Sequence, residues 1–171
     1  MRNKLEFEEL SGWQEFEELV ASYFRAIKEE KSIVKVKVEK SGEGSDAGRD
    51  ILITFRLTDS VSEFKRKWIV QCKFHKKSVS KSNLSGINIP SLIHEYRADG
   101  YLLVCRRDVT SVVSNMFENL RKNCRFSYGY EIWTGDELKT KILPEPNLIQ
   151  KFFPEYFEFT RSVKQPNLED L

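Results

Sequence analysis

The sequence has few cysteines and no long hydrophobic run. Its three cysteines form no Cys-x-x-Cys pair and leave one thiol over in any pairing scheme. A chain of 171 residues with 40% apolar residues can build a core without disulfides, so we expect reduced thiols and a cytoplasmic protein. Its longest apolar runs, such as residues 101–105, are far shorter than the roughly 20 residues of a membrane span. The first ten residues lack the apolar core of a signal peptide. We therefore expect no membrane partner and no secretion.

The chain also lacks an overall excess of charge of one sign, because its formal net charge is +2. The charges are unevenly distributed, however. Residues 63–81 carry a net charge of +6, whereas residues 1–24 carry −4 and residues 131–171 carry −3. A basic centre of this kind can present one positive face to a phosphate backbone. A solvated, lysine-rich hairpin explains the same charges, so charge alone does not decide between the two.

Hydrophobic periodicity predicts helices and strands in the order α-β-β-β-α-β-α-β-α. Apolar residues from Trp13 to Ile27 recur at helical spacing, and Ser11 with Gln14 is typical of a capped helix start. Further helices are predicted over residues 89–98, 109–124 and 136–143, and strands over residues 33–38, 50–57, 67–74, 101–105 and 130–133. This order indicates an α/β fold with a central mixed sheet and helices on both faces. We find no internal repeat and no low-complexity segment.

Three polar side chains are predicted to meet at one end of the second and third strands. Asp50 lies where the second strand begins, and the third strand carries Gln71 and Lys73. Because side chains alternate along a strand, Gln71 and Lys73 share one face and Cys72 lies on the other. If these strands pair as a hairpin, Asp50 can approach both. A carboxylate, an amide oxygen and an ammonium group then form one cluster.

Such a cluster suits phosphodiester hydrolysis. Mg²⁺ prefers oxygen ligands, so Asp50 and Gln71 can hold it together with a substrate phosphate. The metal lowers the pKa of a bound water, and Lys73 can orient that water and offset the charge that develops on the phosphate. Glu17 can join the metal site, through water, if the first helix packs beside these strands.

Three segments resemble motifs of the Mrr-type restriction endonucleases in the PD-(D/E)XK nuclease superfamily. They are FEELV (16–20), DAGRD (46–50) and QCK (71–73), in the family's order and on the expected elements. The resemblance covers about residues 11–143 and has one departure, Ala47 where the loop usually has Gly. It implies a restriction-endonuclease-like α-β-β-β-α-β core.

The resemblance also assigns roles. Asp50 would be the principal metal ligand and Gln71 the second, Lys73 the catalytic lysine, Glu17 the helix carboxylate that completes the site, and Asp46 a supporting residue. It implies a Mg²⁺-dependent endonuclease for double-stranded DNA, with Mn²⁺ expected to substitute, in a restriction or antiphage defence system. We expect a nuclease domain over residues 1–143 and a C-terminal extension over 144–171 that leads to a further domain. Homo-oligomerisation, or clustering by a fused sensor domain, would bring two active sites together.

Each residue also has a plainer interpretation. Asp50 can end a turn, Gln71 can pair with backbone, Lys73 can be solvated and Glu17 can lie on a helix surface. Cys72 is expected to pack in the core. His75 and His94 are expected to be a loop residue and a helix-surface residue. Four basic residues near the predicted site can bind phosphate or simply be solvated: Arg49, Lys76, Lys77 and Lys81.

Two other functions fit the same motifs. One keeps the chemistry and changes the substrate to junctions or branched DNA. The other is a catalytically silent DNA-binding module of the same fold, which the presence of Asp50, Gln71 and Lys73 argues against. No helix-turn-helix or zinc module is evident in the sequence, so base specificity is expected to come from elsewhere.

Overall fold

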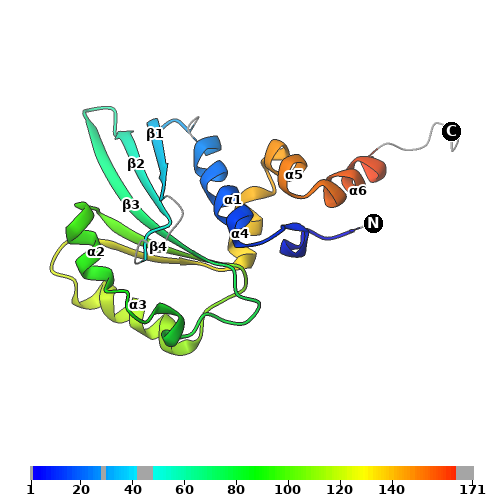
Figure 1. Ribbon diagram of the computed structural model, residues 1–171. Coiled ribbons are helices and arrows are strands. Elements are labelled where there is room, and N and C mark those ends of the chain that lie inside the picture. The colour runs from blue at the N-terminus through cyan, green and yellow to red at the C-terminus, as the bar shows by residue number, and fades with distance from the viewer. Residues whose placement is uncertain (1, 28–29, 42–47, 165–171) are drawn as a thin grey trace, which may run out of the picture.

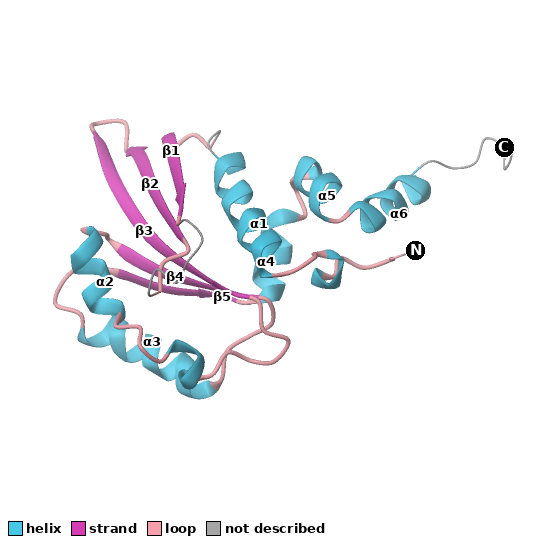
Figure 2. Cartoon of the chain, viewed as in Figure 1, coloured by secondary structure: helices cyan, strands magenta, loops and turns pink. Residues whose placement is uncertain are grey.

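The fold is a mixed five-stranded sheet between two layers of helices, seen in a computed structural model that describes residues 2–27, 30–41 and 48–164 (Figure 1, Figure 2). The strands lie in the order β1-β2-β3-β4-β5. They span Ile33–Lys40, Ile51–Thr58, Glu63–Lys73, Gly100–Cys105 and Gly129–Trp133. β1, β2 and β3 pair antiparallel, whereas β3, β4 and β5 pair parallel. β3 is thus the junction between the two halves of the sheet.

The helices cover both faces of the sheet, as the sequence predicts. α1 (Trp13–Ala26) and α4 (Gly135–Ile142) lie on one face, and α2 (Ile89–Tyr96) and α3 (Ser111–Asn123) on the other (Figure 1). Alternation along the strands gives each face its own core. Val70 and Cys72 of β3 are buried under α1, while Ile69 is buried with the α2–α3 layer. The expected packing of Cys72 in the core is confirmed.

The end of the chain forms two helices that the sequence reading left unassigned. α5 (Pro146–Phe152) and α6 (Pro154–Lys164) lie beside η1 (Phe7–Glu9), which is a short 3₁₀ helix near the N-terminus (Figure 1). Ile149 and Phe153 are buried in the α1-side core. The carboxylate of Glu9 accepts hydrogen bonds from the backbone N–H groups of Glu155 and Tyr156. The two ends of the described chain therefore pack against each other.

Two local predictions were wrong. Gly12, not Ser11, is the N-cap of α1, and the Ser11 backbone N–H and hydroxyl instead donate to the Glu15 carboxylate at 3.2 and 2.6 Å. Trp13 begins the helix 55% exposed, because the first turn extends past the sheet face that buries the rest of the apolar stripe. The third strand also begins earlier than predicted, at Glu63, since it continues the hairpin with β2 to its turn.

The α2–α3 layer begins with the connection that follows β3. This connection includes η3, a 3₁₀ helix over Lys81–Leu84, and Val79 pairs with Val109 in an isolated bridge. Pro90 lies in the first turn of α2, as predicted, where its missing N–H is not needed. Within the described ranges, no helix combines the length and the apolar character that crossing a membrane requires.

Candidate active site

The β2–β3 hairpin brings Asp50 to Gln71, as the sequence predicts. The Asp50 backbone N–H donates to the carbonyl of Val70 at 3.0 Å, which continues the ladder one residue before β2. The Asp50 Oδ2 atom then accepts from Gln71 Nε2 at 2.8 Å and from the Cys72 backbone N–H at 2.6 Å. These two donors fix the carboxylate at the end of β3. Asp50 is therefore held by the strand that carries the other site residues.

Gly48 sets the direction of the chain into β2. Its φ of +102° is in the region that L side chains rarely adopt, and an added Cβ would lie 2.8 Å from Ile87 and 2.9 Å from Leu92. The Arg49 guanidinium lies over the Tyr96 ring of α2, with its Cζ 4.7 Å from the ring centroid. Gly48 and Arg49, which directly precede Asp50, thus pack on the α2 side of the sheet.

Glu17 approaches the same carboxylate from α1, on the opposite face of the sheet from Gln71. Burial, then the negative charge of Asp50, raises the pKa of Glu17 to about 7. This pKa already includes the opposing effect of the Lys40 ammonium, which lowers it, and a smaller contribution from a hydrogen bond with Asp50, which raises it. Two carboxyl groups in hydrogen-bond contact resist simultaneous ionisation. The pair is therefore suited to receive a cation or to hold a proton.

A hollow of about 270 Å³ opens beside this pair, lined by α1 and the end of β3. Glu17, Lys73 and Cys72 line it, which places the predicted helix carboxylate and lysine around one space. Although Cys72 and Lys73 alternate, both reach the hollow because β3 ends there. His75 and Trp13 complete the rim. The described residues thus bring together Glu17, Asp50, Gln71 and Lys73.

The donors present fit a divalent metal ion that prefers oxygen. Gln71 is 7% exposed, and its Oε1 atom is buried without a hydrogen-bond partner among the described residues. A buried amide oxygen without a donor is costly unless something binds it. The carboxylate of Asp50, which contacts both Gln71 and Glu17, offers further oxygen donors, and oxygen is the donor type that Mg²⁺ takes. Among the described residues, no group of three or more His, Cys, Asp or Glu side chains that could hold a metal ion occurs.

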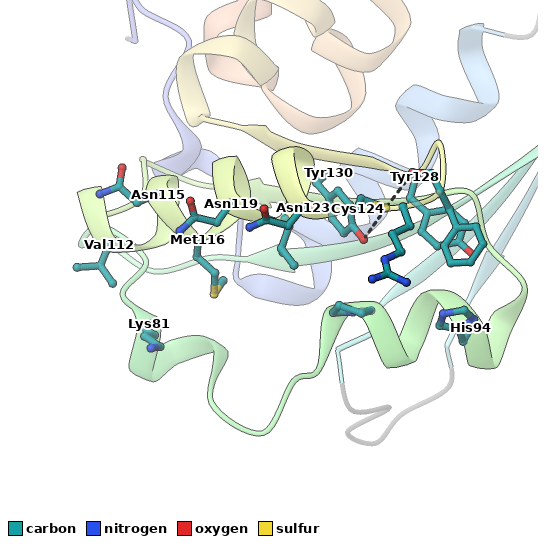
Figure 3. A pocket seen from close by; sticks show the side chains of 14 residues that line it. Lys81, His94, Val112, Asn115, Met116, Asn119, Asn123, Cys124, Tyr128 and Tyr130 are labelled. Atoms are coloured by element: carbon teal, nitrogen blue, oxygen red, sulfur yellow. Dashed lines mark hydrogen bonds between the residues drawn. The ribbon is translucent and has the colours of Figure 1, made fainter.

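The remaining predicted residues lie in different places. Asp46 lies outside the described residues. Lys76 is exposed and lines a cavity of about 570 Å³ with Arg106, Arg107 and Lys139. Lys77 is exposed. Lys81 begins η3 and lines a separate cavity of about 730 Å³ between α2 and α3 (Figure 3), as does His94. Lys76 therefore lies by the active-site end of the sheet, whereas Lys81 borders a different surface.

The structure adds residues that sequence reasoning missed. Arg106 directly follows β4, and its backbone N–H donates to the carbonyl of Lys73 at 2.9 Å. Arg107 follows it, and Lys139 of α4 lines the same cavity. The signal was available, since parallel strands end at the same edge of a sheet and two arginines follow the fourth strand. Trp13 gave no such signal because it matched the apolar stripe of α1.

Comparison with known proteins identifies the family and a similar fold. A model of the Mrr_cat family, described as restriction endonuclease, matches residues 8–142. The MspJI restriction endonuclease, solved in complex with a 27-mer oligonucleotide, has a similar fold, with a TM-score of 0.59 and 13% identity over 92% of this chain and 33% of that one. The DNA modification-dependent restriction endonuclease AspBHI gives a TM-score of 0.49 at 11% identity, over 94% of this chain and 43% of that one.

A curated relative, Protein U54 of human herpesvirus 6B (strain Z29), is 29% identical over 96 residues, which are 56% of this chain and 20% of that protein. The chain thus spans a fifth of that relative and a third of the MspJI chain. The fold and the site define a nuclease domain of the restriction endonuclease class. Because the family model covers most of the sequence, the chain belongs to the Mrr_cat restriction endonuclease family.

Proposed function

We propose that this protein is a Mg²⁺-dependent endonuclease that hydrolyses phosphodiester bonds of double-stranded DNA, with Mn²⁺ able to substitute. The observation that carries this is the convergence of Asp50, Glu17 and the buried Gln71 Oε1 beside a hollow that Lys73 lines. Asp50, Gln71 and Glu17 would hold the metal. When bound, Mg²⁺ would neutralise charge on the scissile phosphate and lower the pKa of the attacking water.

The protein's own groups orient the reacting atoms and stabilise the charge that develops on them. Lys73 donates to the attacking water and to a non-bridging phosphate oxygen, where negative charge grows in the transition state. Gln71 and the Cys72 backbone N–H hold the Asp50 carboxylate in place through two hydrogen bonds. Fixed donors and acceptors of this kind lower the barrier because they need no reorganisation during the reaction.

The charge beside the hollow supports a nucleic-acid substrate. Lys76, Arg106, Arg107 and Lys139 gather at the end of β4 and the start of α4, where they outnumber the three carboxylates of Glu8, Asp108 and Asp136 that line the same cavity. Arg106 is 11% exposed and is paired with Glu8 at 3.0 Å, so it is a positioned cation rather than a mobile one. We propose that this basic group contacts the DNA backbone, together with the predicted contacts of Arg49, Lys77 and Lys81, while Asp46 supports the metal-binding loop.

The direct test is cleavage of supercoiled plasmid with Mg²⁺, with Mn²⁺ and with EDTA. We expect metal-dependent nicking or linearisation that the Lys73→Ala variant lowers by about 100-fold or more. Lys65→Ala is the matched control, because it removes the same group from an exposed position on the same strand at the far end of the hairpin. Cleavage that persists in Lys73→Ala, or that is lost equally in Lys65→Ala, would refute the assignment of Lys73.

Two further functions remain to be compared with this one. A nuclease for branched DNA would cut a four-way junction faster than the linear duplex of the same sequence. A catalytically silent binding module would bind DNA without cutting it, even when two copies are linked into a dimer (the forced dimer). The intact set of Asp50, Gln71 and Lys73 favours an active enzyme, and the proposal is withdrawn if the forced dimer binds DNA and leaves it intact.

We further propose a cytoplasmic role in restriction or antiphage defence, with residues 1–143 as the nuclease domain and residues 144–171 as an extension that leads to a further domain. Cutting both strands together needs two sites, so oligomerisation or clustering by a fused sensor domain would activate it. Sedimentation with and without duplex DNA tests this. Complete double-strand cleavage by a strict monomer would argue against it.

A further inference from the structure

A second cavity, of about 410 Å³, lies on the α1 face at the opposite end of β3 from Lys73. Trp68 and Arg66 of β3 line it, and at about 3.3 Å per residue Trp68 lies about 17 Å along the strand from Lys73. The volume is at the lower end of the range for small-ligand pockets. The cavity is therefore separate from the proposed nuclease site and large enough for a small molecule.

Five aromatic side chains line this cavity: Tyr23, Phe24, Phe55, Trp68 and Trp133. Trp68 forms a platform, because its indole lies across β4 and β5 at two glycines. A Cβ on Gly100 would lie 2.6 Å from the ring, and a Cβ on Gly129 would lie 2.4 Å from it. Any side chain at either position would push the ring away from the sheet. The two glycines thus allow one indole face to rest on the backbone while Trp68 borders the cavity.

Arg66 and Lys141 lie against aromatic rings of the cavity, and neither forms an ion pair with a carboxylate in the described parts of the chain. The Arg66 guanidinium lies 5.3 Å from the Trp68 centroid, and the Lys141 Nζ lies 4.5 Å from the Trp133 centroid. The Arg66 Nε atom is buried and no described group accepts from it. Cation–π contact compensates only part of the lost hydration of these groups. An anion placed between them would satisfy donors that the protein leaves unsatisfied.

Carboxylates also border the cavity. Glu30 and Glu131 line it together with Arg66 and Lys141, and Glu131 also pairs with Arg121 of α3 at 3.9 Å, so the charges of the cavity are mixed rather than only basic. A simple anion such as phosphate would meet repulsion from the two carboxylates. A ligand that carries an anionic group at one end and N–H donors at the other would satisfy both kinds of charge. A flat ring between these ends would use the aromatic lining.

We propose that this cavity is a binding site for a nucleotide, with the base among the aromatic side chains, the phosphate on Arg66 and Lys141, and amino groups of the base on the Glu30 and Glu131 carboxylates. The volume of about 410 Å³ favours a single nucleotide. The unit can be free or can be the end of a strand, since both offer the same chemistry. The site does not depend on the proposed nuclease function, because no residue is shared with the hollow around Glu17 and Lys73.

The test uses the whole chain and tryptophan fluorescence. The chain has three tryptophans, and two of them, Trp68 and Trp133, line the cavity. A Trp13→Phe background leaves only these two as reporters. The background also carries Lys73→Ala and is studied in EDTA, so that nucleotide binding at the nuclease site does not contribute to the fluorescence change. GMP, AMP, UMP, guanosine and a 5′-phosphorylated single-stranded decamer are the probes, and calorimetry provides an independent affinity.

We expect GMP and AMP to quench the fluorescence in a saturable way. UMP, whose base has no amino group, binds more weakly than GMP. Guanosine, which lacks the phosphate, binds at least tenfold more weakly than GMP. Arg66→Met lowers the GMP affinity at least tenfold, whereas Arg56→Met does not change it. Arg56 is the matched control because it is an exposed arginine on the neighbouring strand and does not line the cavity. Tighter binding of the decamer than of GMP would identify a strand end as the natural ligand.

Three results would overturn the proposal: no saturable quenching by any nucleotide or by the decamer, equal affinities for GMP and guanosine, or an unchanged affinity in Arg66→Met. If Arg66→Met loses its cooperative thermal transition, Lys141→Met replaces it with the same expected loss of affinity. If the parent protein cuts DNA but the binding tests fail, the nucleotide site is refuted and the nuclease is not. If the binding tests succeed but the parent protein does not cut DNA, the nuclease is refuted and the nucleotide site is not.

Discussion

The Glu17–Asp50 pair predicts that metal-free protein loses stability as the pH rises through neutrality. Burial and the adjacent Asp50 raise the pKa of Glu17 from 4.5 to about 7 in the folded protein. Between these pH values the folded state keeps a proton that the unfolded state has lost. Folding is therefore favoured at the acidic end of this window, and the advantage disappears as the pH rises through the folded pKa.

The magnitude follows from the width of this window. One proton held across it is worth at most about 3 kcal/mol. Glu17 is partly exposed, so solvent screening reduces the expected effect to about 1–2 kcal/mol. Glu17→Gln removes the titrating group. We expect the variant to be as stable as the parent near pH 5 and more stable by about 1–2 kcal/mol at pH 8.

Urea denaturation in EDTA at several pH values measures this difference, followed by circular dichroism. Glu18→Gln is the contrasting control on the next residue of α1. Burial tends to raise the pKa of Glu18, but hydrogen bonds from Lys40 and Arg25, both at 2.9 Å, outweigh it and lower the pKa. Glu18→Gln should therefore lose stability at neutral pH. A Glu17→Gln variant with the same pH dependence as the parent would refute the proposed carboxylate coupling.

Four other predictions follow from single contacts. Tyr101→Phe should raise the free energy of unfolding by about 1 kcal/mol, because the buried Tyr101 hydroxyl has no hydrogen-bond partner among the described residues; a destabilised variant in urea titrations would show that a partner exists. Gly129→Ala should lower it by about 1–3 kcal/mol, since the new Cβ would overlap the Trp68 ring; an unchanged melting temperature would contradict this close packing. Trp13→Ala should change stability by less than about 0.5 kcal/mol, because the side chain is mostly exposed, yet slow plasmid cleavage; normal cleavage would exclude a substrate contact. Adding Mg²⁺ at pH 8 should raise the melting temperature of the parent and not of Asp50→Ala, and an equal rise in both would place the metal elsewhere.

Periodicity predicts the order of the elements because each one buries a regular face. The alternating lysines of β1 and the continuous apolar run of β4 are direct signatures of burial on one face and on both faces. Trp13 shows the limit of this reasoning. It matches the helical stripe, but only the position of the helix end relative to the sheet determines whether it is covered. The seven residues of α5 offered too few turns for a clear period, and α6 mixes aromatic and acidic side chains without an evident apolar stripe.

The candidate site also has a part that follows from local sequence and a part that depends on tertiary structure. The spacing of Gln71 and Lys73 on one strand is local, and the meeting of Asp50 with Gln71 follows once a hairpin is assumed. The hydrogen bond from the Cys72 backbone N–H to Asp50 depends on strand register, which spacing alone leaves open. The cavity around Trp68 depends on residues of several elements distant in sequence, including Gly100 and Gly129, and no linear motif indicates it.

The outermost strand limits how two copies of this protein can associate. β1 is an edge of the sheet, and Lys35, Lys37 and Lys40 are spread along it. Lys37 pairs with Glu39 at 3.2 Å and Lys40 with Glu18 at 2.9 Å. A second copy that extended the sheet at β1 by a two-fold axis would crowd these charged side chains and disturb their ion pairs, which opposes such growth. Polyanions, in contrast, would be attracted to the same edge. A dimer that cuts both strands is therefore expected to form through another surface and to leave the lysine edge open to solvent or to the DNA flank.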